Sequence, residues 1–287
     1  MNYTFVLIDY EPDYFKYVIN TVLSVDKNAE IYILSNKKIN YKNTNYINLN
    51  DISSDKIKEY LSLNVYKNSI FHDNPLWKTS SLRVLYLNEI KKYLNIKSFV
   101  HLDNDILIYK PFEEIQHLMN QNRFNITQSN SKTLIFGYSY FGENEEFEDI
   151  ANLFIEKIKY GIKNEWKFNN GKPLNEMQLL AAIYNDTKGF FKLLPSLPYQ
   201  SDIIFDPASY GQYLDGTHAH PKKWYRKGHF NQNDYVGVEI ISKRIKINFS
   251  GKQPVVKWEG RNYNLANLHV HSKRLEKFLP KNYKEYI

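Results

Sequence analysis

Short apolar, strand-like segments alternate with helix-like segments along the first half of this chain. The runs Phe5–Ile8, Ile31–Leu34 and Phe99–Leu102 are too short for stable helices and have the apolar composition of buried strands. Between them, the stretches Tyr14–Val25 and Leu76–Leu94 are long enough for helices and carry helix-forming patterns. Strands and helices that alternate at this spacing predict an α/β fold with a largely parallel sheet.

The second half of the chain is less regular, and no internal repeat or low-complexity linker divides it from the first half. Few long periodic segments occur between Pro195 and Gly260, which is typical of functional loops. We therefore predict one compact domain over residues 1–287, whose character changes near residue 123. Further predicted elements are a helix capped by Asp51 and running to Leu61, a helix opened by Pro111, a strand or hairpin over Ser131–Phe141, helices over Phe147–Ile158 and Leu174–Ile183, and strands over 245–249 and 268–270.

The composition excludes several classes of protein. The 287 residues include no Cys, which removes disulfide scaffolds, iron–sulfur ligation, Cys-based zinc sites and thiol nucleophiles. The sequence contains no run of about 18 apolar residues, so it predicts no membrane span. We expect a cytoplasmic protein, with peripheral membrane contact left open. The net charge of +7 is compatible with an anionic partner of several kinds.

The segment Asp103-Asn104-Asp105 directly follows the apolar run Phe99–Leu102. In an open α/β sheet, ligands bind at the carboxyl ends of the strands. Two carboxylates separated by one residue can approach one divalent cation, and oxygen ligands suit Mg²⁺ or Mn²⁺. The sequence does not favour an EF-hand, because Leu107 would occupy its third ligand position and no Gly follows it. The alternative interpretation is an acidic turn between two strands.

A second segment, Asn267–Lys273, contains His269 and His271, which point to the same side if the segment is a strand. Imidazole is an acceptable ligand for Mn²⁺, and Lys273 could neutralise a phosphate. The alternative is a polar strand with one structural histidine. A competing pair, His218 and His220, lies in a loop rich in Pro, Lys and Trp, and we interpret it as surface polarity rather than a zinc site.

These segments together resemble the metal-dependent glycosyltransferases of the GT-A fold. The resemblance covers the early strands, the helical stretch WKTSSLRVLYL, the motif LDNDILIYKPF, the stretch NEMQLL and the late HVHSK. It implies a Rossmann-like, mostly parallel central sheet flanked by helices, with a nucleotide-binding half over 1–122 and a sugar and acceptor half over 123–287. It also implies transfer of a sugar from a nucleotide-diphosphate sugar to a hydroxyl acceptor.

The resemblance assigns the metal, Mn²⁺ or Mg²⁺, to Asp103 and Asp105, with a late histidine as a further ligand. His269 is the first choice because its spacing to Lys273 matches the family, and His271 remains an alternative. A UDP-sugar is expected as donor rather than a GDP-sugar, and the acceptor is a glycan, a glycolipid or a protein; no nucleic acid is expected as a partner. The residues implied to bind the nucleotide sugar are Ile8, Asp9, Tyr10, Arg83, Asn104 and Lys273.

Glu176 resembles the position at which such enzymes place an acidic residue at a helix start. If the reaction inverts the anomeric centre, Glu176 is expected to accept the proton of the acceptor hydroxyl. If the configuration is retained, Glu176 is expected to position the acceptor. The loop Phe205–Leu214 is predicted to line the sugar and acceptor pocket, and the basic cluster over 222–227 is a candidate contact for an anionic acceptor or a membrane.

Two other functions fit the same residues. A metal-dependent phosphoesterase or nuclease could use Asp103, Asp105, His269 and His271, although two-metal sites usually need further carboxylates near the first strand. A non-catalytic protein that binds carbohydrate or nucleotide could share the fold, because fold does not fix function.

Overall fold

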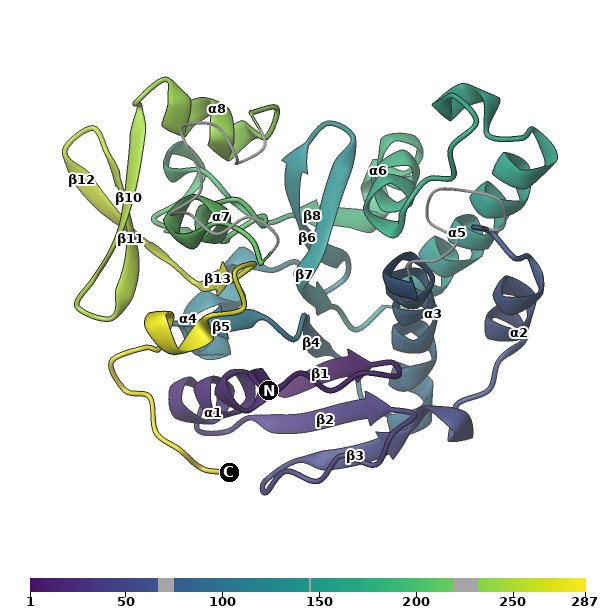
Figure 1. Cartoon of the computed structure of the whole chain (residues 1–287), viewed down its shortest axis with the longest axis horizontal. Helices are drawn as coiled ribbons and strands as arrows, with labels where there is room; N and C mark the ends of the chain where they lie inside the picture. The colour runs from purple at the N-terminus through teal and green to yellow at the C-terminus, as the bar shows by residue number, and fades with distance from the viewer. Residues whose placement is uncertain (67–74, 145, 219–231) are drawn as a thin grey trace.

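The computed structural model describes residues 1–66, 75–144, 146–218 and 232–287. A seven-stranded sheet runs through the middle of the molecule (Figure 1), in the order β3-β2-β1-β4-β7-β6-β8. Its strands are β1 (Asn2–Leu7), β2 (Glu30–Ser35), β3 (Asn45–Asn48), β4 (Phe99–Leu102), β6 (Phe124–Asn130), β7 (Thr133–Phe141) and β8 (Phe191–Leu193).

Most neighbouring strands of this sheet are parallel. The pairs β1–β2, β2–β3, β1–β4 and β6–β8 are parallel, whereas β7 runs antiparallel to both β4 and β6. The predicted Rossmann-like, mostly parallel central sheet is therefore confirmed, with one reversed strand beside β4.

Helices cover both faces of the sheet. The described helices are α1 (Phe15–Val25), α2 (Asp55–Ser62), α3 (Pro75–Leu94), α4 (Phe112–Ile115), α5 (Glu146–Lys163), α6 (Glu176–Asp186), α7 (Tyr210–Asp215) and α8 (Tyr235–Ile241). One apolar core joins α1 to the sheet and to the C-terminal strands. A second core joins α2, α3, α5 and α6 to the opposite face, where Figure 1 shows them gathered together.

The short helices of 3-10 type connect the larger elements at the surface. They are η1 (Leu49–Asp51), η2 (Gln116–Leu118), η3 (Lys167–Asn169), η4 (Lys188–Phe190), η5 (Pro198–Gln200) and η7 (Leu275–Phe278). The prediction of a helix capped by Asp51 is wrong, because α2 begins only at Asp55. Ser54 is its N-cap, and the Ser54 hydroxyl accepts a hydrogen bond from the Ile57 amide at 3.3 Å.

Two smaller sheets lie beside the central one. A four-stranded sheet has the order β10-β11-β12-β9, built from β9 (Ile203–Ile204), β10 (Ile245–Ser250), β11 (Gln253–Trp258) and β12 (Arg261–Leu265). It occupies part of the region that we predicted to be loops. A third sheet pairs β5 (Ile106–Ile108) with β13 (Asn267–His269) in antiparallel register. Among the described residues, no helix combines the length and the apolarity that crossing a membrane requires.

Candidate active site

The acidic motif lies at the carboxyl end of the central strand β4. All four residues of β4 are buried between β1 and β7, so the strand delivers Asp103 and Asp105 to the edge where the parallel strands end. The Asp103 amide donates to the Gly137 carbonyl at 2.8 Å, and the Ile106 amide closes the turn on the Asp103 carbonyl at 3.2 Å. The backbone of the motif is thus fixed on both sides, as a binding site for a small ligand requires.

The late histidine segment meets Asp105 through the pairing of β13 with β5, in which His269 stands opposite Ile106. The Nε2 atom of His269 lies 3.1 Å from Oδ1 of Asp105, and the Lys273 ammonium group contacts Oδ2 of the same carboxylate. The Val270 amide also donates to the Asp105 carbonyl at 2.9 Å. The C-terminal part of the chain therefore completes the environment of the acidic motif.

The ring of His271 stacks on the ring of His269, with centroids 4.1 Å apart and planes inclined by 19°. Ligand atoms of Asp105, His269 and His271 lie within 4.8 Å of one another, which makes these three residues a candidate metal site. Nδ1 of His269 and Nε2 of His271 are buried and have no hydrogen-bond partner in the described part of the chain. Of these two atoms, Nδ1 of His269 faces Gly137, whereas Nε2 of the same ring faces Asp105. Imidazole nitrogens together with a carboxylate fit Mn²⁺, which accepts both ligand types.

Electrostatics keep both carboxylates of the motif ionised. Burial by itself raises the pKa of Asp103, but the Arg83 guanidinium outweighs it and lowers the pKa below its ordinary value. Burial likewise opposes ionisation of Asp105, but His269 and Lys273 hold its pKa well below the ordinary value. Two carboxylates compensated by neighbouring cations are suited to exchange those cations for a divalent ion.

Arg83 connects the acidic motif to Glu176. From the middle of α3 its guanidinium contacts Asp103, and Nη2 lies 3.6 Å from Oε1 of Glu176. The guanidinium also lies over the Phe136 ring, 5.2 Å from its centroid. His101 lies on β4 two residues before Asp103, and its Nε2 atom is 3.5 Å from the Asp103 carboxylate. These contacts hold Arg83 and Asp103 in one orientation.

Glu176 is the first residue of α6. The N-cap residue Asn175 forms a reciprocal capping box with Gln178, which defines where the helix begins. Glu176 is 5% exposed and accepts a hydrogen bond from the Ser80 hydroxyl at 3.0 Å. Burial raises the pKa of Glu176, and the Arg83 charge opposes this effect without cancelling it. A carboxyl group with a raised pKa beside a ligand site is suited to proton transfer.

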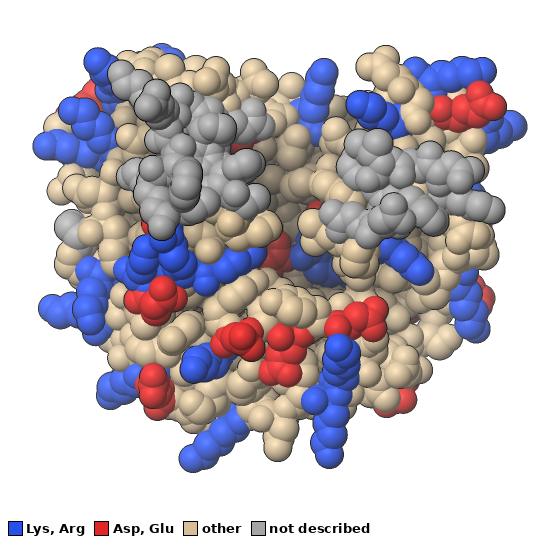
Figure 2. Space-filling model, viewed as in Figure 1, with Lys and Arg blue, Asp and Glu red and all other residues tan. Residues whose placement is uncertain are grey.

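A cleft of about 460 Å³ opens beside the acidic motif. Tyr10 and Leu76 stand at its rim with 60% and 58% of their surfaces exposed. Figure 2 shows this face of the molecule hollowed near its centre, with acidic and basic side chains meeting at the floor of the hollow. The volume lies in the range of small-molecule sites. The cleft is lined by Val6, Leu7, Ile8, Asp9, Tyr10, Pro75, Leu76, Thr79, Ser80, Arg83 and Asn104.

The lining includes every residue that we predicted to contact the nucleotide sugar except Lys273, which lies at Asp105. Asn104 is held by the Tyr14 hydroxyl, which donates to its side-chain oxygen at 3.3 Å. Asp9 adopts a left-handed backbone conformation with φ of 61°, and its amide donates to the Asn36 side chain at 2.8 Å. The strained turn after β1 is therefore supported by the residue that follows β2.

Most of the loop that we predicted to line the sugar and acceptor pocket is buried. Asp206 is 1% exposed, and Oδ1 accepts hydrogen bonds from the amides of Ser209 at 2.8 Å and Tyr210 at 2.9 Å. Oδ2 accepts from the amides of Gly211 at 3.0 Å and His269 at 2.9 Å. This carboxylate thus ties the start of α7 to the histidine segment. His220 and the basic cluster over 222–227 lie outside the described residues.

Sequence reasoning missed the glycine on which His269 packs. A Cβ atom at Gly137 would lie 2.9 Å from Nδ1 of His269, so the ring occupies space that only glycine leaves open. Nothing local in the sequence signals this role, because Gly137 lies inside a strand far from either motif. A glycine within a strand is a general sign of close approach, but it does not name the partner.

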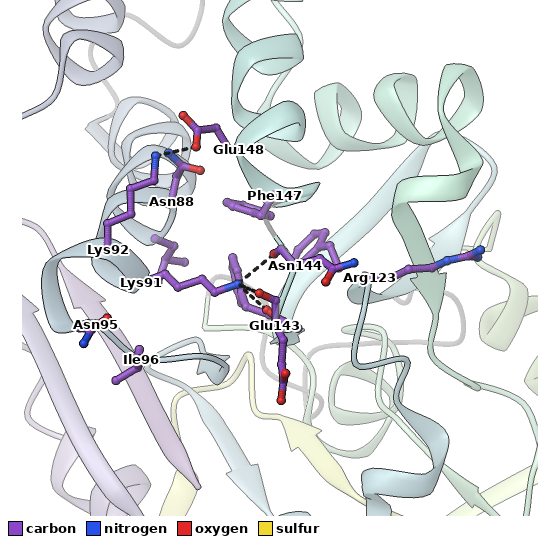
Figure 3. Close-up of a pocket in the computed structure, with 14 residues that line it drawn as sticks. Asn88, Lys91, Lys92, Asn95, Ile96, Arg123, Glu143, Asn144, Phe147 and Glu148 are labelled. Atoms are coloured by element: carbon purple, nitrogen blue, oxygen red, sulfur yellow. Dashed lines mark hydrogen bonds and ion pairs between the residues drawn. The ribbon is translucent and has the colours of Figure 1, made fainter.

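A second cavity of about 220 Å³ lies between α3, α5 and the end of β7 (Figure 3). Lys91 points into it and donates to the carbonyls of Gly142 at 2.8 Å, Glu143 at 2.6 Å and Asn144 at 2.9 Å. Lys92 pairs with Glu148 at 2.5 Å. Lys91 and Lys92 thus hold the end of α3 against the segment that follows β7. This cavity is separate from the acidic motif.

No protein-family model and no curated protein sequence matches the chain. Among solved structures, it is similar to the apo form of mouse xyloside xylosyltransferase 1, with 8% identity, a TM-score of 0.46, and 68% of this chain and 85% of that one covered. It is also similar to the galactosyltransferase LgtC, with 12% identity, a TM-score of 0.42, and 68% and 73% covered. It is similar as well to the apo form of the glycosyltransferase GlyE of Streptococcus pneumoniae, with 10% identity, a TM-score of 0.42, and 74% of this chain and 47% of that one covered. Similarity this low carries no argument about activity, which has to come from the site.

Proposed function

We propose that the chain is a GT-A type glycosyltransferase that moves a sugar from a nucleotide-diphosphate sugar to a hydroxyl acceptor. The observation that carries the proposal is the junction of a nucleotide-sized cleft with a partly buried cluster of two carboxylates, two imidazoles and two basic groups. A diphosphate needs positive charge and a sugar needs polar groups, and both are present at one strand edge.

The donor is proposed to lie in the cleft with its base near Tyr10 and its diphosphate toward Asp103 and Asp105. A divalent ion, Mn²⁺ or Mg²⁺, would be held by Asp103, Asp105 and His269 or His271 and would stabilise negative charge on the leaving group. Lys273 and Arg83 add fixed positive charge on either side of the same position. UDP-sugars are the proposed donors, with GDP-sugars as the alternative that the binding experiment compares.

In the transfer, the bond between the anomeric carbon and the diphosphate oxygen breaks, and its electron pair stays on the diphosphate. The acceptor oxygen bonds to the anomeric carbon and loses its proton. We assign this proton to Glu176 if the configuration inverts, because burial has already raised the Glu176 pKa toward that of an effective base. If the configuration is retained, Glu176 holds the acceptor and the proton passes to the departing diphosphate oxygen. A glycan, glycolipid or protein hydroxyl is the proposed acceptor.

Thermal-shift measurements with UDP and GDP, each with and without Mn²⁺, test the proposal. Stabilisation that requires both nucleotide and metal is expected, and it should disappear in Asp105→Asn. Asp202→Asn is a matched control, because Asp202 is an exposed carboxylate outside the cleft. The absence of any nucleotide response in the wild-type protein would overturn the proposal. Slow release of UDP from a UDP-sugar would distinguish an enzyme from a protein that only binds.

The phosphoesterase alternative gains no support from the described residues. They contain one group of three or more ligating side chains that could hold a metal ion, namely Asp105, His269 and His271. Two-metal phosphoesterases need a second set of ligands about 4 Å away. Cleavage of a plain phosphodiester by the purified protein would nevertheless restore that alternative.

A further inference from the structure

The four-stranded sheet has one buried face and one polar face. On the buried face, Ile245 and Val256 are at most 1% exposed and belong to the core that also contains β1 and α1. Strand alternation turns the neighbouring residues outward. The outward residues are Lys246 and Asn248 on β10, Gln253, Val255 and Lys257 on β11, and Asn262 and Asn264 on β12.

Two lysines stand directly opposite each other on this face. Lys246 pairs with Lys257 in the β10–β11 register, and Lys257 pairs in turn with Asn262 on β12. All three are exposed. Like charges at directly opposed positions destabilise an antiparallel pair. Neither lysine takes part in an ion pair within the part of the chain that the structure describes.

The surroundings add to the positive charge. Lys243, Lys252 and Arg261 are exposed at the ends of β10, β11 and β12, where Glu259 is also exposed, and Asp202 is exposed just before β9. Figure 2 shows Lys and Arg side chains along the upper left margin, where Figure 1 places β10, β11 and β12. A local excess of exposed cations of this kind attracts polyanions at long range.

The sheet leads directly into the candidate active site. β12 continues through Ala266 into β13, which ends at His269. The seven steps from Asn262 to His269 span at most about 25 Å of fully extended chain. A polymer lying across the polar face could therefore reach the cleft with its end.

We infer that the polar face of this sheet, with Lys246 and Lys257 at its centre, binds an anionic stretch of a glycan acceptor. The inference rests on the proposed glycosyltransferase function and names the class of its acceptor: a polysaccharide that carries carboxylate or phosphate groups. Side-chain amides on β11 and β12 can bond sugar hydroxyls, and the two lysines pair with the anionic groups. The outward residues include no aromatic side chain, and Val255 is their one aliphatic side chain, so this face lacks the interfacial anchors that favour a membrane.

The test measures binding of polygalacturonate oligomers and of their neutral methyl esters to the whole protein at low ionic strength. The wild-type protein should bind the acid form and not the ester, and binding should weaken as salt is added. Lys246→Ser combined with Lys257→Ser should weaken binding about tenfold, the loss expected for two exposed charge contacts. The matched control is Lys188→Ser combined with Lys192→Ser, which removes two exposed lysines beside and on β8.

Each result of this binding test either supports the inferred acceptor surface or overturns it. Equal binding by the wild-type protein and the Lys246/Lys257 variant, or equal binding of acid and ester, would overturn the inference. Tighter binding to phosphatidylglycerol vesicles or to single-stranded DNA than to polygalacturonate would replace it with a membrane or nucleic-acid surface. The thermal response to UDP and Mn²⁺ is measured in the same variants and should be unchanged. A wild-type protein that lacks this response but binds polygalacturonate would refute the glycosyltransferase and leave the polyanion surface intact.

Discussion

Adding one methyl group at Gly137 tests whether His269 belongs to the metal site. The new Cβ would lie 2.9 Å from Nδ1 and 3.1 Å from Cε1 of His269, and 3.2 Å from Cδ1 of Ile106. Nonbonded carbon contacts are favourable at about 3.5–4.0 Å, so the imidazole ring must withdraw by roughly 0.5–1 Å. Metal–ligand distances tolerate only about 0.2 Å. The displacement therefore exceeds what a coordinated histidine can absorb.

We expect Gly137→Ala to lower the affinity for Mn²⁺ by about 10- to 100-fold, the range found when the support of a metal ligand is disturbed. Overpacking should cost about 1–3 kcal/mol of folding free energy, which is smaller than the usual total of about 5–15 kcal/mol. The variant should remain folded. Isothermal titration with Mn²⁺ in the presence of UDP measures the first effect, and urea denaturation measures the second.

Gly189→Ala is the matched control, because no heavy atom lies within 4 Å of the Cβ that it introduces. It should bind Mn²⁺ as the wild-type protein does. A folded Gly137→Ala protein with wild-type affinity for Mn²⁺ would refute the reasoning, because the ring of His269 could then move without consequence for the metal.

Three further predictions concern Arg83, Glu176 and Asn175. Arg83→Lys should reduce kcat/KM for donor hydrolysis at least about tenfold, because an ammonium group cannot serve Asp103 and Glu176 together as the guanidinium does; an unchanged value would remove Arg83 from the site. Burial raises the pKa of Glu176 above 4.5, so between the pKa of the unfolded state and that of the folded state the folded protein binds a proton that the unfolded chain has lost, and its stability falls as pH rises. Glu176→Gln should remove this contribution to the pH dependence of the unfolding free energy, measured by urea denaturation. An identical pH dependence in the variant would contradict the burial argument. Asn175→Ala removes the side-chain half of the capping box and should cost about 1 kcal/mol, measured by the same denaturation, with no loss expected if α6 is held by packing alone.

The sequence predicted the first half of the fold well because its elements are regular and apolar. The runs at Phe5–Ile8 and Ile31–Leu34 correspond to β1 and β2, and the long helix predicted before the acidic motif corresponds to α3. The strand β3 was missed because it has four residues, two of them Asn, and no alternating apolar pattern. β11 was missed because Pro254 and the adjacent pair Val255 and Val256 break the alternation that identifies strands, and β12 was missed because its alternating stretch is only four residues long.

The candidate site likewise includes residues that the sequence revealed and residues that it did not. The motif at Asp103 and Asp105 and the pair His269 and His271 were recognisable because short spacings along a strand place side chains at known positions. The internal location of Asp206 was not recognisable, since a carboxylate that accepts four backbone amides has the same sequence surroundings as one in an exposed loop.

By itself, the sequence determined which chemical groups are present and which short segments carry them. Only the tertiary structure decided which of these groups meet. Lys273 contacts an aspartate 168 residues away because β13 pairs with β5, and His269 fits there because Gly137 has no side chain. The physical reason is that strand pairing and close packing depend on the complementarity of distant segments, whereas periodicity and capping depend on neighbours along the chain.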